Sequence, residues 1–139
     1  MTHDEMNQVI EEHFRSEERG DVEGTLATFT DDIVHDVVGR PENPLVGKDA
    51  VRAFYSGIFE AIRFQKFNSM HRYFGEDFAV DDSMVDARAV RGPQGVESEG
   101  RPLRFRFLHV FEFRDGLISR ENAWQDEGAI QRQLADRSQ

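Results

Sequence analysis

The sequence lacks cysteine altogether, which excludes disulfides, thiolate nucleophiles and cysteine-ligated metal sites. Basic residues are scarce as well, because 17 lysines and arginines stand against 27 aspartates and glutamates, a net charge of -10. That charge repels phosphate backbones and anionic lipids, so we expect neither nucleic acid nor a membrane as a partner. A transmembrane helix needs about 20 consecutive apolar residues, and no apolar run approaches that length. The acidic start of the sequence also lacks the features of a signal peptide. We therefore expect a soluble, cytoplasmic protein.

What the sequence does contain is phenylalanine: twelve, against two tyrosines and one tryptophan. A chain of 139 residues is the length of one domain with a sizeable core. We therefore expect a single domain over residues 1–139 with an aromatic interior. Such an interior is either a packed core or the wall of a pocket for an apolar ligand.

Hydrophobic spacing predicts helices first and strands afterwards. Helical periodicity runs from the Thr2 capping box to Gly20, from Asp21 to before Asp31, and from Val51 to Ile62 after a Pro/Gly loop over 39–47. Strand patterns follow over 64–73, 78–80, 84–90, 103–113 and 117–124, with a strand at 33–38, a glycine-rich loop at 92–100 and a final helix capped by Asp126. This order predicts an α+β fold in which three N-terminal helices pack on a curved antiparallel sheet, with a short C-terminal helix.

The most informative residue is His109, because it interrupts an apolar strand face. Side chains alternate along a strand, so His109 shares its face with Leu103, Phe105, Phe107, Phe111 and Phe113. Burial disfavours the charged imidazolium, so a histidine there needs a hydrogen-bond partner or a ligand. His109 is thus either a core histidine satisfied by a neighbour or part of a site.

Two more histidines lie on apolar patterns. His13 falls on the apolar stripe of the first helix, and His35 lies next to Asp36 in a β-branched strand. Neighbouring strand residues point to opposite faces, so either His35 or Asp36 faces inward.

The last hairpin decides which side chain faces His109. A two-residue Asp115-Gly116 turn places Asn122 opposite His109 and turns Trp124 to the same side, whereas a three-residue Arg114-Asp115-Gly116 loop with a glycine bulge places Glu121 there, with Ala123 and Gln125 beside it. The residues themselves permit both registers.

Three segments carry a resemblance to a known family. They are Phe29-Thr-Asp-Asp-Ile-Val-His-Asp, Pro44-Leu-Val-Gly-Lys-Asp-Ala-Val51 and Phe111-Glu-Phe-Arg-Asp-Gly-Leu-Ile118. Together with the layout, they resemble the SnoaL-like branch of the nuclear transport factor 2 superfamily. The resemblance implies a cone-shaped α+β barrel that admits a small apolar ligand between helices and sheet, and a homodimer. The superfamily contains cyclases, isomerases, dehydratases, epoxide hydrolases and members that catalyse nothing, so the fold alone does not name a reaction.

Comparison with ketosteroid isomerase, a member of that superfamily, implies positions for site residues. Its first-helix tyrosine falls on His13 and its protonated aspartate on His109. Its base falls on Asp36 in a gapped alignment, whereas the ungapped alignment turns His35 inward, as in many SnoaL-like relatives; we favour His35 and keep Asp36 as the alternative. The arginine and two aspartates of limonene epoxide hydrolase fall near Met84, Asp86 and Ala123, so we do not expect that chemistry.

The resemblance also favours the bulged hairpin, which pairs His109 with Glu121 and leaves Trp124 on the outer face at a dimer interface. The expected function is general acid–base proton transfer on an apolar carbonyl compound, as in an isomerase, cyclase or dehydratase. The expected catalytic residues are His35 or Asp36, His109, Glu121 and His13, and the expected pocket residues are Phe54, Tyr55, Phe105, Phe107, Ala123 and Gln125. We expect no cofactor and no metal. The alternative is a non-catalytic ligand-binding or dimerisation module.

Overall fold

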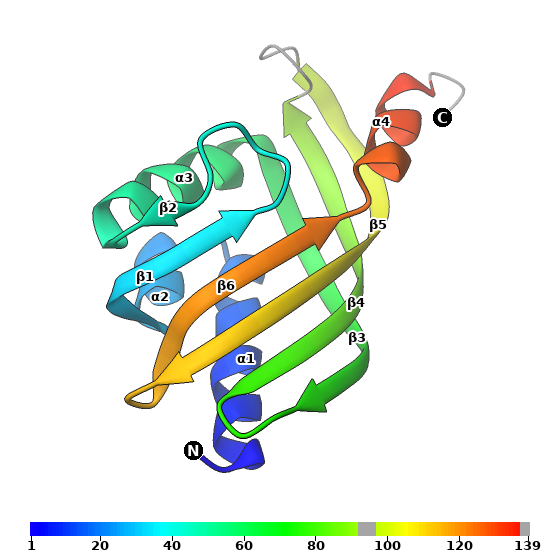
Figure 1. Ribbon diagram of the computed structural model, residues 1–139. Coiled ribbons are helices and arrows are strands. Elements are labelled where there is room, and N and C mark those ends of the chain that lie inside the picture. Colours follow the sequence, from blue (N-terminus) through cyan, green and yellow to red (C-terminus); the bar gives the residue numbers. More distant parts are fainter. Residues whose placement is uncertain (92–96, 137–139) are drawn as a thin grey trace.

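Figure 1 shows the computed structural model of the chain, which describes residues 1–91 and 97–136. As the hydrophobic spacing predicts, the helices α1–α3 lie in the first half of the chain and the long strands follow them. In chain order the elements are α1 (His3–Glu18), α2 (Val22–Leu26), β1 (Phe29–Val37), β2 (Leu45–Val46), α3 (Lys48–Ala61), β3 (Ile62–Phe74), β4 (Phe78–Arg91), β5 (Glu97–Arg114), β6 (Leu117–Gln125) and α4 (Glu127–Ala135).

The strands form one curved, unclosed sheet in the order β2-β1-β6-β5-β4-β3. Neighbouring strands are antiparallel, as predicted, except that β1 and β6 run parallel. The helices α1, α2 and α3 cover one face of the sheet, while α4 packs beside β5 near the opposite end of the molecule from the N-terminus (Figure 1). The predicted α+β cone with three N-terminal helices and a short C-terminal helix is confirmed.

Local signals explain where the helices begin and which faces they bury. Thr2 and Glu5 form the predicted capping box of α1, and its apolar stripe is buried against the sheet. The predicted cap of α4 is also present, since Asp126 accepts a hydrogen bond from the Ala129 backbone at 3.0 Å. No helix among residues 1–91 and 97–136 is long and apolar enough to cross a membrane.

The strands β1, β4 and β5 differ most from the predicted lengths. β1 begins at Phe29 rather than at Ile33, and β5 begins at Glu97, so residues 97–100 of the predicted glycine-rich loop are strand, while residues 92–96 lie outside the described residues. β4 runs unbroken through Asp81, which is fully buried. The strand tolerates this charge because Arg72 donates to Asp81 at 2.9 Å and the hydroxyls of Ser69 and Ser83 also donate to it.

The last hairpin combines features of both predicted registers. Arg114 pairs with Leu117, so the turn has two residues, Asp115 and Gly116, both with positive φ (54° and 79°) as in a type I′ turn. The predicted three-residue loop is therefore wrong. The register shifts within β6 instead, because Phe113 pairs with Ile118 and Glu112 with Arg120, which leaves Ser119 as a bulge. This bulge still turns Glu121 inward and Trp124 outward, as predicted.

Candidate active site

Three elements bring buried polar side chains together beneath the helices. His13 comes from α1, His35 from β1 and Glu121 from β6, and none is more than 2% exposed. His13 Nε2 lies 2.9 Å from Glu121 Oε1, and His35 Nε2 lies 2.9 Å from Glu121 Oε2. The parallel pairing of β1 with β6 sets this arrangement, because it places His35 directly beside Glu121. Glu121 is thus the centre of the site.

His13 is positively charged, and the hydrogen bonds around it give the reason. The Thr28 hydroxyl donates to the Thr25 carbonyl at 2.6 Å, so it accepts from His13 Nδ1 at 3.0 Å. The other nitrogen, Nε2, lies between Glu121 and Glu17 Oε1, the latter at 2.7 Å, and both carboxylates accept only. Burial alone lowers the pKa of His13, but Glu121 and Glu17 outweigh it and raise that pKa to about 10.

Glu121 is ionised and holds two further groups in place. Burial raises the pKa of Glu121, but the two histidines, His35 first, outweigh burial and hold it well below its ordinary value. His35 Nε2 also lies 3.0 Å from the Tyr55 hydroxyl. Burial and then the nearby carboxylates raise the pKa of Tyr55 well above its ordinary value, so the phenol keeps its proton. Because Glu121 only accepts hydrogen bonds, His35 carries a hydrogen on Nε2, and in the tautomer with a single ring hydrogen Nδ1 has a free lone pair.

His109 is buried but is not held by Glu121, which corrects the predicted pair. Glu121 lies opposite Phe111 rather than opposite His109, whose partner across the strands is Ala123. Its ring stacks between Phe107 at 4.2 Å and Phe111 at 5.3 Å, centroid to centroid, and its Nδ1 is buried without a hydrogen-bond partner. Burial lowers the pKa of His109, so this imidazole is neutral.

The remaining predicted residues divide into two groups. A small inner chamber is lined by the predicted residues Phe54, Tyr55, Phe107 and Gln125, together with His35, His109 and Glu121. Phe105 and Ala123 are not among its lining residues; they are buried in the core, since Phe105 packs farther along β5 and Ala123 is covered opposite His109. Asp36 lies on the other face of β1, because side chains alternate and His35 faces inward.

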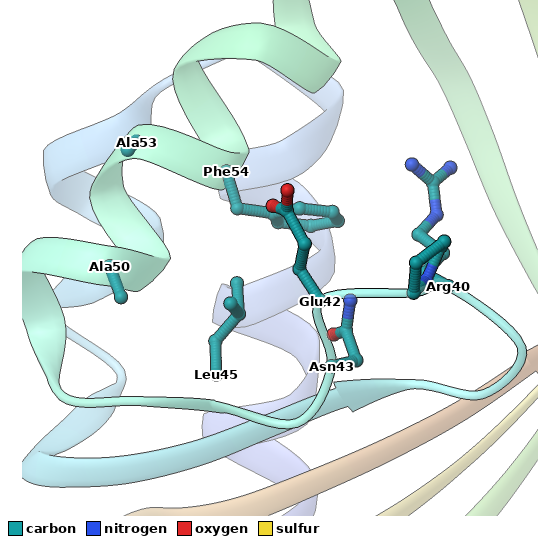
Figure 2. A pocket seen from close by; sticks show the side chains of 8 residues that line it. Arg40, Glu42, Asn43, Leu45, Ala50, Ala53 and Phe54 are labelled. Carbon is teal, nitrogen blue, oxygen red and sulfur yellow. The ribbon is translucent and has the colours of Figure 1, made fainter.

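The inner chamber is small, at about 30 Å³, which is the space of a water molecule rather than of an organic ligand. A cleft of about 380 Å³ adjoins it at the surface, between α3 and the loop that follows β1 (Figure 2). Arg40 and Phe54 line both the chamber and this outer cleft. Arg40 and Phe54 therefore lie at the boundary between the outer cleft and the chamber that His35 and His109 line.

Sequence reasoning missed Glu17, Arg40 and Asp81. Glu17 lies one helical turn after His13 on the same stripe, a signal that was available in the sequence. Asp81 shares the odd-numbered, buried parity of Val85 and Ala87 on β4, a signal that the acidic pair Asp81-Asp82 obscured. Arg40 lies in a loop whose path no periodicity predicts. Among the described residues, no group of three or more histidine or acidic side chains is arranged to hold a metal ion.

Comparison with known proteins places the chain in a family. The family model of the SnoaL-like domain matches residues 10–121, which include His13, His35, His109 and Glu121. The chain belongs to the SnoaL-like domain family. Comparison with curated proteins finds none that is similar to this SnoaL-like chain.

Solved structures of low sequence identity share the SnoaL-like fold. A proposed polyketide cyclase from Xanthomonas campestris pv. campestris matches with a TM-score of 0.84 and 18% identity, over 95% of this chain and 98% of that one. A second proposed polyketide cyclase, from Silicibacter sp. TM1040, matches with a TM-score of 0.82 and 23% identity, over 94% and 96%. An LEH-like epoxide hydrolase from M. tuberculosis matches with a TM-score of 0.73 and 17% identity, over 94% and 89%. At these identities the comparisons establish the fold and not the reaction.

Proposed function

We propose that this SnoaL-like domain is a small-molecule enzyme that moves a proton to or from a carbon next to a carbonyl group of an apolar substrate, as an isomerase, cyclase or dehydratase does. The observation that carries the proposal is His109. It is a neutral imidazole with an unpartnered, buried Nδ1 on a chamber wall of phenylalanines, and His35 Nδ1 on the same wall is unpartnered as well. Buried polar groups without partners are uncommon and mark sites where a ligand completes the hydrogen bonding.

The site's side chains suit separate parts of such a reaction. His35 takes the proton on Nδ1, because Glu121 holds its Nε2–H. The electron pair of the broken C–H bond moves onto the carbonyl oxygen, and the N–H of neutral His109 donates to that oxygen. His35 then returns the proton to another carbon of the substrate, which completes an isomerisation. Charged His13 keeps Glu121 ionised and in place, and the Tyr55 hydroxyl lies 3.0 Å from His35 Nε2.

The test is deuterium exchange, because it needs no knowledge of the product. A panel of small aryl ketones, 2-acetonaphthone among them, is incubated with the protein in D₂O, and loss of the α-proton signal is followed by NMR. We expect exchange above the buffer rate, and we expect His35→Gln to abolish it and His109→Gln to reduce it by about 100-fold or more, the range for general acid–base groups. His71→Gln is the matched control, since His71 is exposed on β3, where it stacks on Tyr73.

Two results would contradict the assignment. Exchange that His35→Gln and His109→Gln leave unchanged would remove these residues from the reaction. Absence of exchange with every ketone would favour the second candidate, a non-catalytic ligand-binding module. The small volume of the inner chamber, about 30 Å³, is the observation on the side of that candidate.

A further inference from the structure

The outer cleft contains an arginine without an acidic partner. Arg40 is half-buried, and its guanidinium carbon lies 5.6 Å from the centre of the Phe54 ring. No ion pair or side-chain hydrogen bond joins Arg40 to any of the described residues. The other half-buried arginines among the described residues each donate to an oxygen of another residue; they are Arg52, Arg72, Arg101 and Arg120. At the entrance to the site a planar fork of five N–H donors therefore has no partner among the described side chains.

The loop that carries Arg40 is held in place. The backbone N–H of Val37, at the end of β1, donates to the Asn43 side chain at 3.0 Å. Two further backbone hydrogen bonds, from Arg40 to Val37 and from Asn43 to Arg40, each of 3.2 Å, tie the turn between them. The guanidinium is thus presented from a braced turn, which limits the entropy that a ligand must remove on binding.

The surroundings define what would fit against Arg40. α3 contributes Ala50, Ala53 and Phe54 to one wall of the outer cleft, and Leu45 adds to the apolar surface (Figure 2). The volume of about 380 Å³ falls in the range of small-molecule sites. The one acidic side chain on the lining, Glu42, is exposed and forms no ion pair with a described residue.

We propose that the outer cleft is the specificity site for an apolar, aromatic ligand that bears a carboxylate, with Arg40 as the residue that binds the carboxylate. The fork matches a carboxylate in a bidentate manner, and the aromatic ring of the ligand stacks with Phe54. This inference rests on the proposed function, since it defines the substrate as an apolar carbonyl compound that also carries an acid group. The acid group stays at Arg40, and the carbonyl end passes the Phe54 ring to reach His109 in the inner chamber.

Calorimetric titration with two probes tests the inference. 2-Naphthoate and 2-naphthamide share a ring system and differ in charge. We expect the wild-type protein to prefer naphthoate. We expect Arg40→Gln to weaken naphthoate binding about tenfold or more, as loss of a charge-assisted hydrogen bond does, and to change naphthamide binding less than about twofold. Arg40→Lys keeps the charge without the fork, so it should fall between the two.

Two control variants sharpen the experiment. Arg63→Gln removes an exposed arginine that lines a different cleft, and it should leave both affinities unchanged. Glu42→Gln removes the acid at the rim and should tighten naphthoate binding. The inference is overturned if wild type binds neither probe or shows no preference for naphthoate, if Arg40→Gln weakens both probes equally, or if Arg63→Gln acts like Arg40→Gln.

The outcomes also separate this inference from the proposed function. Naphthoate binding that depends on Arg40, in a protein without ketone exchange, would support the carboxylate site and contradict the enzyme. Ketone exchange in a protein whose naphthoate binding does not depend on Arg40 would support the enzyme and contradict the carboxylate site.

Discussion

Raising the pH should destabilise this protein because of His13. The pKa of His13 is about 10 in the folded protein, against 6.5 as its ordinary value, which applies to the unfolded chain. Between these values the folded state binds one more proton than the unfolded state, so the free energy of unfolding falls by about 1.4 kcal/mol per pH unit. The stabilisation is complete below pH 6.5 and is lost as the pH rises through 10, and its total is on the order of 5 kcal/mol. A small domain has about 5–15 kcal/mol altogether, so the effect should be large.

Urea unfolding at pH 6, 7, 8 and 9 measures this slope, with circular dichroism as the probe. The variant His13→Gln has no titrating group at this position, so its free energy of unfolding should be lower at pH 6 and flatter with pH. The control His71→Gln should keep the wild-type slope, because His71 is exposed on the sheet. A wild-type slope no steeper than that of His13→Gln would refute the charged histidine at the centre of the site.

Four further predictions concern other parts of the molecule. Acid should also destabilise the protein, because the fold holds the pKa of Glu121 well below its ordinary value. The stabilisation from Glu121 is complete above about pH 4.3 and is lost as the pH falls. A midpoint of urea unfolding that stays constant from pH 5 to pH 3 would contradict this prediction. His109→Leu should abolish deuterium exchange of the ketone. It should also raise the free energy of unfolding by about 1 kcal/mol, because it removes a buried polar atom that has no partner. A lower midpoint of thermal unfolding would contradict the prediction that His109 is unsatisfied. Asp81→Asn should lower the free energy of unfolding, measured in urea, by about 3 kcal/mol, because Arg72, 10% exposed, loses its buried charged partner. A decrease below about 1 kcal/mol would show that Glu11 and Asn7 suffice as partners of Arg72. We also propose that the homodimer expected from the family resemblance forms through the exposed cross-strand pair of Trp124 and Leu108. In sedimentation experiments Trp124→Glu should then be a monomer. A wild-type protein that sediments as a monomer would contradict the proposal.

Much of the fold follows from residue periodicity, and the reasons are local. α1 and α4 follow from the caps at Thr2 and Asp126 and from apolar spacing, since such signals lie within a few residues of one another. The inward direction of His35 follows from its alternation with Asp36, combined with the family resemblance. His109 is buried among phenylalanines as its strand pattern predicts.

The partners of these residues could not be predicted, because they depend on pairing between distant strands. The contact of His35 with Glu121 requires β1 and β6 to run side by side in parallel, and no local pattern carries that information. The register of Glu121 depends on a bulge at Ser119, which the turn sequence Asp115-Gly116 does not indicate. The sequence predicts separate strands at 78–80 and 84–90, because the side chain that compensates the charge of Asp81, Arg72, comes from a neighbouring strand.

A crystal structure of the protein soaked with 2-acetonaphthone tests the central claim most directly. We predict that the ketone lies across Phe54, with its carbonyl oxygen within about 3.2 Å of a ring nitrogen of His109 and its methyl carbon facing His35. A ketone bound elsewhere, or a crystal in which Phe54 still closes a chamber of about 30 Å³ at saturating ketone, would contradict the account.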